Sequence, residues 1–205
     1  MKVNFKLLQT IWTFVALSIF TSCANKSAEL PILSYNYKDG KKVIYKIDDF
    51  EFINQNGHLI TADSTKGMVH TMNFFFTTCP SICPPMRLIQ SDLADTFSDE
   101  KHFKQYGITM DLKRDTLQQL QLYAATHAIH SKHWQLLRAH SEAQLQAIAN
   151  ALKTNFKPNE DDSDFYHSSY VALIDKQQHI RGFYNLLVPQ EVTLLKSDIQ
   201  TLLKK

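Results

Sequence analysis

Apolar residues change their spacing along the chain, and each change marks a predicted element. Residues 68–76 are rich in apolar and Phe positions and predict a strand buried on both faces. Shortly afterwards Met86, Ile89, Leu93 and Phe97 recur at the three- and four-residue spacing of one helix face. The sequence therefore predicts a central strand, a loop and a helix, in that order.

The same alternation of strand and helix continues through the rest of the chain. Further strands are predicted at residues 43–45, 50–53, 58–60, 108–112, 134–137, 169–174 and 179–184, with a hairpin turn at Asn56-Gly57. Asp115-Thr116 predicts a cap for a helix that begins at Leu117, Ser141 with Gln144 predicts one before Leu145, and Pro189 predicts the start of the last helix. The acidic residues 160–164 indicate a solvated loop.

This order of elements predicts an α/β fold. Strands and helices alternate early and a hairpin and a helix close the chain, which favours a central mixed sheet with helices on both faces and an N-terminal hairpin. A thioredoxin-like fold has this order. The length of 205 residues suits one such domain, and we expect it to span residues 43–205.

The amino terminus is typical of an export signal. Lys2 and Lys6 precede a short apolar core that runs through residues 11–20. Two small residues then precede Cys23, as in a bacterial lipoprotein cleavage site, although Phe20 stands where Leu is usual. We expect residues 1–22 to be a lipoprotein signal peptide, Cys23 to carry the lipid, and residues 23–42 to form a tether without regular structure. An uncleaved anchor or an ordinary signal remains the alternative.

Composition and charge exclude several classes of protein. The hydrophobic share of 44% and the charged share of 20% are ordinary for a globular domain and exclude a wholly disordered chain. Lys and Arg number 22 against 20 Asp and Glu, and the signal peptide would remove two lysines and no acid. The mature chain would then be neutral, so nucleic acid is not expected as a partner.

Cys79 and Cys83 are the two cysteines left for chemistry once Cys23 is assigned to the lipid. They lie in a loop that contains Pro80 and leads into the predicted helix at Pro84, so the loop is stiff and ends at a helix N-terminus. Such a position favours the thiolate, which is the form that binds metal or attacks a disulfide. Their spacing permits convergence on one ion or closure into a disulfide, and a structural disulfide is the simplest alternative in an exported protein.

His167 is the candidate third donor. It precedes the predicted strand 169–174, and in a thioredoxin-like sheet this hairpin packs beside the strand that carries the cysteine loop. Two thiolates and one imidazole suit Cu(I), tolerate Cu(II) and bind Zn(II) less distinctively. Taken alone, His167 would be interpreted as an ordinary loop histidine.

These residues resemble the Sco/SenC family of copper proteins. The strand and loop 75–84, the Asp-x-x-x-Asp-Thr pattern at 111–116 and the histidine before 170–175 are similar to the family's strand, loop and hairpin. The resemblance implies that Cys79, Cys83 and His167 are copper ligands. It also implies delivery of copper to the binuclear copper centre of cytochrome c oxidase. Many members have Asp before the ligand histidine, where this chain has Tyr166.

The leading hypothesis is a copper metallochaperone of the bacterial cell envelope, lipid-anchored and facing the periplasm or exterior, and not an enzyme. Its expected partners are a copper donor protein and the apo copper subunit of cytochrome c oxidase or another copper acceptor. The alternative is a thiol-disulfide oxidoreductase in which Cys79 and Cys83 are catalytic and reduce the acceptor's cysteines. A peroxide-reducing enzyme is a third, weaker interpretation.

Other residues have simpler interpretations. His127, His130 and His133 would form a metal-binding ladder only if one helix ran through all three, and they are better interpreted as solvated cations near a helix C-terminus. Asp111 and Asp115 are interpreted as caps and turn formers.

Overall fold

The computed structural model describes residues 29–205 apart from 131, 159–164 and 167. Its body is a seven-stranded sheet in the order β11-β10-β5-β6-β7-β3-β4. The strands are β3 (Glu51–Asn54), β4 (Leu59–Thr61), β5 (Val69–Phe75), β6 (Phe103–Thr109), β7 (Trp134–Ala139), β10 (Tyr170–Ile174) and β11 (Ile180–Asn185). The central strands β5, β6 and β7 are parallel and the outer pairings are antiparallel, so the sheet is mixed, as predicted.

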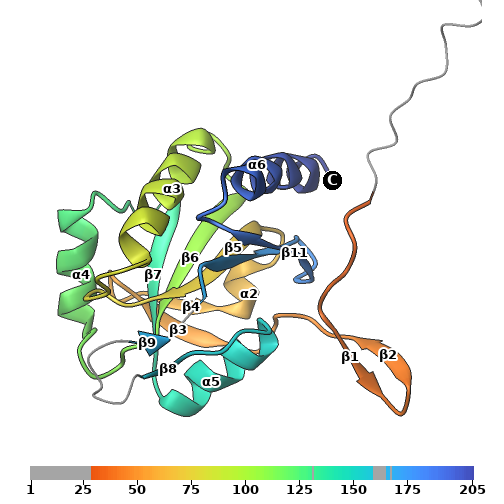
Figure 1. Ribbon diagram of the computed structural model, residues 1–205, viewed down its shortest axis with the longest axis horizontal. Helices are drawn as coiled ribbons and strands as arrows, with labels where there is room; N and C mark the ends of the chain where they lie inside the picture. Colours follow the sequence, from red (N-terminus) through yellow and green to blue (C-terminus); the bar gives the residue numbers. More distant parts are fainter. Residues whose placement is uncertain (1–28, 131, 159–164, 167) are drawn as a thin grey trace, which may run out of the picture.

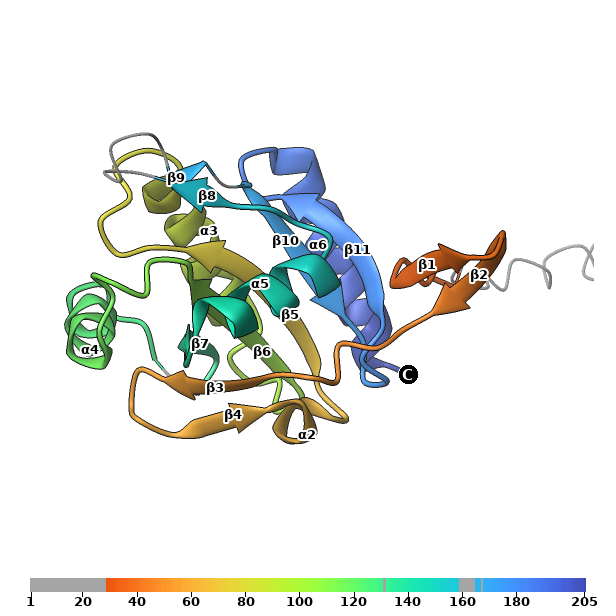
Figure 2. The same cartoon turned by 90° about the horizontal axis from the view of Figure 1, so that it is seen from below.

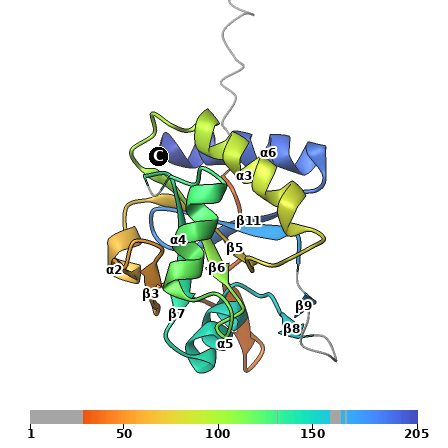
Figure 3. The same ribbon diagram turned by 90° about the vertical axis from the view of Figure 1, so that its left-hand side faces the viewer.

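Helices cover both faces of this sheet, as Figures 1 and 3 show. The helices are α2 (Ala62–Thr65), α3 (Cys83–Thr96), α4 (Leu117–Thr126), α5 (Glu142–Ala151) and α6 (Pro189–Leu203). Helices α3 and α6 lie on one face, and α5 lies on the other. Among the described residues no helix has the length and apolar character needed to cross a bilayer.

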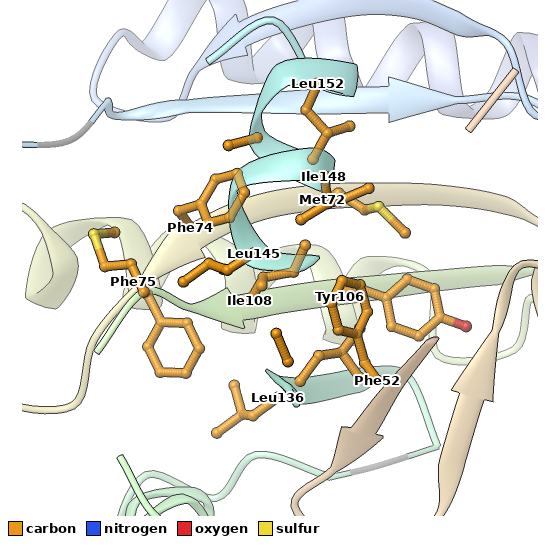
Figure 4. Packing of buried hydrophobic residues seen from close by; sticks show 14 of the residues in the cluster. Phe52, Met72, Phe74, Phe75, Tyr106, Ile108, Leu136, Leu145, Ile148 and Leu152 are labelled. Atoms are coloured by element: carbon orange, nitrogen blue, oxygen red, sulfur yellow. The ribbon is translucent and has the colours of Figure 1, made fainter. Parts of the chain in front are cut away.

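The core consists of two hydrophobic clusters, one on each side of the sheet. On the side of α5, Leu145 and Ile148 pack over Met72 and Phe74 of β5, as Figure 4 shows. On the side of α3 and α6, Leu93 and Leu195 belong to a second cluster. Every residue of β5 is buried, which confirms the prediction of a strand covered on both faces.

Two predicted helix caps are present, and each satisfies backbone donors that the first turn leaves unpaired. The Thr116 hydroxyl accepts from the Gln119 N–H at the start of α4. The Ser141 hydroxyl accepts from the Gln144 N–H at the start of α5. The Gln144 side chain accepts from the N–H of His140 rather than of Ser141, so only half of the predicted capping box forms.

The expectation that residues 23–42 lack regular structure is wrong for part of the described region. Residues 35–38 and 41–44 form a hairpin of two strands, β1 (Tyr35–Lys38) and β2 (Lys41–Ile44). Its turn is Asp39-Gly40, with φ of 51° and 73°, and Asp-Gly is a strong signal for a two-residue hairpin turn. The mixed polar composition of this stretch obscured the signal.

Strand β6 lies at a different position from the one predicted. Residues 108–112 were expected to form it, whereas β6 begins at Phe103 and ends at Thr109. Parallel pairing with β5 starts at Val69–Phe103 and stops at Phe75–Thr109, so tertiary pairing sets both ends of β6. The predicted hairpin at Asn56-Gly57 is confirmed as β3 and β4. The acidic loop 160–164 lies outside the described residues; the short strands β8 (Lys157–Pro158) and β9 (Phe165–Tyr166) stand on either side of it.

Candidate metal centre

The cysteine loop begins where β5 ends, and it leads directly into α3. Cys83 is the first residue of α3, and the N-cap residue Ile82 contributes no side-chain hydrogen bond. Pro84 and Pro85 follow and have no N–H, while the Met86 N–H donates to the Ile82 carbonyl. The Cys83 N–H is therefore the one backbone donor in the first turn of α3 that the helix itself leaves without an acceptor.

The sulfur of Cys79 receives this donor. The Cys83 N–H donates to Cys79 Sγ at 3.4 Å, and the Cys79 N–H donates to the Phe76 carbonyl at 3.3 Å. Both cysteines are buried, with 8% and 5% of their surfaces exposed. A sulfur at the N-terminus of a helix, close to an N–H donor, favours the thiolate. The loop therefore places Cys79 and Cys83 together at a buried helix end, as their spacing predicted.

Asp115 anchors the start of this loop. Its carboxylate accepts from the Thr77 N–H at 3.1 Å, from the Thr77 hydroxyl at 2.5 Å and from the Thr109 hydroxyl. Burial raises the pKa of Asp115, and the hydrogen bonds from Thr109 and Thr77 oppose this rise. Asp115 thus ties the segment before Cys79 to the end of β6, a role that the sequence analysis missed.

Asp115 had been interpreted as a cap, and that interpretation is wrong because Thr116 caps α4. Asp111 does form a turn, since its carboxylate accepts from the Arg114 N–H at 3.0 Å and pairs with the Arg114 guanidinium. Both acids are buried, and they differ in their partners: Asp111 accepts from Arg114 within its own turn, whereas Asp115 accepts from Thr77 and Thr109.

Tyr123 and Arg87 lie beside the cysteines, and no sequence pattern singles them out. Burial raises the pKa of Tyr123 to about 12, the charges of Cys83 and Cys79 add to the rise, and Arg87 opposes it and forms a hydrogen bond with the phenol. The cavity lined by Cys83, Phe75 and Tyr123 measures about 10 Å³. An organic substrate does not fit there, because this volume corresponds to about one water molecule.

His167 and Cys23 lie outside the described residues. The described chain on both sides of residue 167 lies at the carboxyl end of β5. Phe165 packs on Phe76, three residues before Cys79, with ring centroids 5.2 Å apart. Beyond residue 167, β10 pairs with β5, with Ala172 opposite Met72. Among the described residues no group of three or more His, Cys, Asp or Glu side chains is arranged to hold a metal ion.

The histidine ladder does not meet its condition for metal binding. Helix α4 ends at Thr126 and His127 is its C-cap, so one helix does not run through His127, His130 and His133. The pKa of His127 is lowered by burial and by Arg87, and the pKa of His133 is lowered by burial and by neighbouring cations. Both shifts disfavour the protonated imidazole, whereas the sequence pattern predicts solvated cations at these positions.

Comparison of the sequence with known proteins gives consistent results. The model of the family SCO1/SenC matches residues 39–203. A SCO2-like protein of Rickettsia felis is 31% identical over 163 residues, which cover 76% of each chain. The SCO1 protein homolog of Bacillus subtilis is 28% identical over 143 residues, which cover 69% of this chain and 74% of the relative.

Solved structures share the fold. A SCO1/SenC family lipoprotein from Bacillus anthracis has a TM-score of 0.71 at 20% identity, over 83% of this chain and 96% of that one. BsSco, described as having a disulfide switch and as a member of the Sco family of cytochrome c oxidase assembly proteins, has a TM-score of 0.68 at 26% identity, over 78% and 94%. Arabidopsis thaliana ScoI with copper bound has a TM-score of 0.62 at 22% identity, over 74% and 96%.

The predicted thioredoxin-like fold is confirmed, since these Sco structures and the chain share it. The Cys-Pro-Ser-Ile-Cys-Pro loop stands at the helix end where the resemblance places it, and the family model spans nearly all of the described chain. The chain belongs to the SCO1/SenC family.

Proposed function

We propose that the protein is a copper metallochaperone that holds copper through Cys79, Cys83 and His167. One observation carries the proposal: the Cys83 N–H donates to Cys79 Sγ at the N-terminus of α3, in a loop that is buried and fixed by Asp115. Two sulfurs held at a helix end are a preformed pair of soft donors, and Cu(I) prefers such donors. Copper is the cargo of this site.

Three observations support His167 as the third ligand. Phe165 lies against Phe76, β10 pairs with β5, and the resemblance to the family places its histidine at this position. An imidazole would complete a Cys2His set and would also suit Cu(II). The copper bound in Arabidopsis ScoI supports the choice of metal.

The acceptor in this proposal is the apo copper subunit of cytochrome c oxidase, or another copper protein, after loading by a copper donor protein. Support comes from BsSco, which is described as belonging to a family of cytochrome c oxidase assembly proteins. Copper would pass by ligand exchange, in which a thiolate of the acceptor replaces one sulfur of this chain at a time. The metal is then never released to solvent.

The site is proposed to work outside the cytoplasm on a lipid anchor. Residues 1–22 would be removed as the signal peptide, Cys23 would carry the lipid, and residues 23–42 would link it to the domain of residues 43–205. The lipoprotein from Bacillus anthracis that shares the fold supports this arrangement. The protein would then reside in the bacterial cell envelope and face the periplasm or exterior.

Anaerobic titration with Cu(I) in the presence of a competing chelator tests the ligand set. The reduced protein should bind one equivalent, and Cys79→Ser, Cys83→Ser and His167→Ala should each weaken binding at least tenfold, the loss typical of a metal site that loses a contact. His58→Ala is the matched control, because His58 is exposed and lies in the β3–β4 turn. Wild-type affinity in any of the three ligand variants would discard this ligand set.

A thiol-disulfide oxidoreductase is the second candidate, and the disulfide switch described for BsSco favours it. The Cys79 thiolate would attack a disulfide of the partner and form a mixed disulfide, with one partner thiolate leaving. Cys83 would then attack Cys79, so that this chain ends as a disulfide and the partner as two thiols. His167→Ala separates the two functions, because a reductase should keep its turnover of a disulfide substrate while a chaperone loses copper.

A further inference from the structure

The β1–β2 hairpin projects from the body of the molecule and carries exposed apolar side chains. Figures 1 and 2 show it at the edge of the fold, away from α4 and β9. Tyr37 is 71% exposed, Val43 47% and Ile44 49%, although Tyr, Val and Ile are residues that usually pack inside. In the described structure nothing from the body covers these side chains.

The same hairpin concentrates positive charge. Residues 35–44 contain the three lysines Lys38, Lys41 and Lys42 against a single acid, Asp39. The predicted mature chain has equal numbers of basic and acidic residues, so this excess is local. Lys42 Nζ lies 4.0 Å from the centre of the Tyr35 ring, which keeps a cation beside an aromatic surface. Exposed aromatic and branched apolar residues together with lysines are typical of segments that bind at a bilayer interface.

The chain before the hairpin is fixed to the body at the edge strand β11. The Leu33 N–H donates to the Ile180 carbonyl at 2.7 Å, the Ile180 N–H donates to the Ser34 hydroxyl at 3.2 Å, and Arg181 donates to the Pro31 carbonyl at 3.2 Å. These bonds set where the hairpin leaves the domain. Its position relative to the body is therefore determined by these hydrogen bonds and does not depend on the tether.

Chain length also limits the distance between Glu29 and the bilayer if Cys23 carries a lipid, as proposed above. Glu29, where the described structure begins, follows Cys23 by six residues, so the two lie within about 20 Å of each other even in a fully extended chain. A basic patch is a common second membrane contact beside a lipid anchor.

We propose that the β1–β2 hairpin rests on the bilayer and binds anionic lipid headgroups through its lysines, with Tyr37 and Ile44, which share one face of the hairpin, at the interface. Because β9 and the loop between β5 and α3 lie on the side away from the hairpin, this contact turns the cysteine loop toward the solvent and its acceptor. The hairpin is thus a second membrane contact that orients the domain.

Fluorescence quenching by brominated lipid tests the proposal on the full chain. Tyr37→Trp and Leu122→Trp are each purified from producing membranes and reconstituted into vesicles of phosphatidylcholine with 30% phosphatidylglycerol, and into vesicles of phosphatidylcholine alone. Leu122 is the matched control, since it is 60% exposed on α4, far from the hairpin. The signal of the wild type, with buried Trp134, is subtracted.

We expect strong quenching of Tyr37→Trp in anionic vesicles, weak quenching in neutral ones, and no difference between vesicles for Leu122→Trp. A lysine at an anionic surface contributes about 1 kcal/mol, or about a fivefold gain in partitioning. Changing Lys38, Lys41 and Lys42 to Gln should therefore remove the extra quenching, as should raising NaCl to about 1 M, where the Debye length falls to about 3 Å.

Equal quenching of Tyr37→Trp and Leu122→Trp would overturn the proposal. Quenching of Tyr37→Trp that stays the same when the three lysines are changed to Gln would also overturn it. A shift of Tyr37→Trp emission that depends on protein density rather than on lipid charge would assign the hairpin to contact with a second copy instead. The intact mass of the protein shows separately whether Cys23 is lipidated, and the copper titration does not involve the hairpin, so each proposal fails independently.

Discussion

The cysteine loop and the β1–β2 hairpin are both short segments, but one is buried in the fold and the other is exposed. The loop is buried, and its backbone is tied to Asp115 and to the first turn of α3. The hairpin is exposed, and besides its own strand pairing and its Asp39-Gly40 turn it is joined to the body by a hydrogen bond from Lys153 Nζ to the Tyr35 carbonyl at 2.6 Å. Changes in the loop should therefore affect the whole fold, whereas changes in the hairpin should affect only what the hairpin touches.

Phe76→Ala should show the largest effect. Phe76 is fully buried and packs on Phe165 beside the cysteine loop. Loss of a buried Phe side chain leaves a cavity, so we expect the free energy of unfolding to fall by about 3–5 kcal/mol. Urea unfolding followed by circular dichroism measures this fall. A loss below about 1 kcal/mol would mean that the loop does not depend on this packing.

Asp115→Ala should follow, with a loss of about 2–3 kcal/mol, because the Thr77 N–H and two hydroxyls lose their acceptor in a buried site. Asp115→Asn is the matched control, since it keeps the size and one acceptor oxygen, and it should lose less. The same urea titration compares them. Equal stability of both variants would show that the hydrogen bonds to Asp115 do not hold the loop.

His70 links the core to pH. It is fully buried in β5, and burial lowers its pKa to about 4. In the unfolded chain the ordinary value of about 6.5 applies, so below that pH the unfolded state binds a proton that the folded state does not bind. Above pH 7 the free energy of unfolding therefore does not depend on His70, and it falls as the pH falls from 6.5 to 4. We expect the free energy of unfolding to be about 2 kcal/mol lower at pH 5 than at pH 7.

Comparison of His70→Gln with His58→Gln by urea unfolding at pH 7 and pH 5 isolates this contribution. His70→Gln should have a smaller difference between the two pH values than the wild type, and the exposed His58→Gln should match the wild type. If His70→Gln shows the full acid dependence, another group is responsible for it.

Tyr37→Ala should have the smallest effect on folding. Because Tyr37 is 71% exposed, we expect the free energy of unfolding to change by no more than about 0.5 kcal/mol. The same variant should weaken contact with anionic vesicles if the hairpin lies on the bilayer. A loss of stability as large as that of Phe76→Ala would show that the hairpin is part of the core and would remove the contrast between the two segments.

Much of the fold could be predicted because apolar spacing reflects burial directly. The buried run in β5, the helix faces of α3 and α6 and the Asn56-Gly57 hairpin all follow from local patterns. The limits of β6 could not be predicted in this way, because its parallel partner determines where it starts and stops. The β1–β2 hairpin had a local signal in Asp39-Gly40, but a mixed composition hid it.

The same distinction between local sequence patterns and tertiary packing applies to the candidate site. By itself the sequence determined that two cysteines and three prolines meet at the entry to a helix, since these residues are close together in the chain. It also determined that three separate segments resemble those of the Sco/SenC proteins. Only the structure showed that the Cys83 N–H donates to Cys79 Sγ and that Asp115 holds the cysteine loop. It also showed that Arg87 and Tyr123 lie beside the two sulfurs. The contacts of Asp115 and Tyr123 join different elements, and only packing of the sheet and helices brings such side chains together. The contact between Cys79 and Cys83 depends instead on how the loop turns into α3.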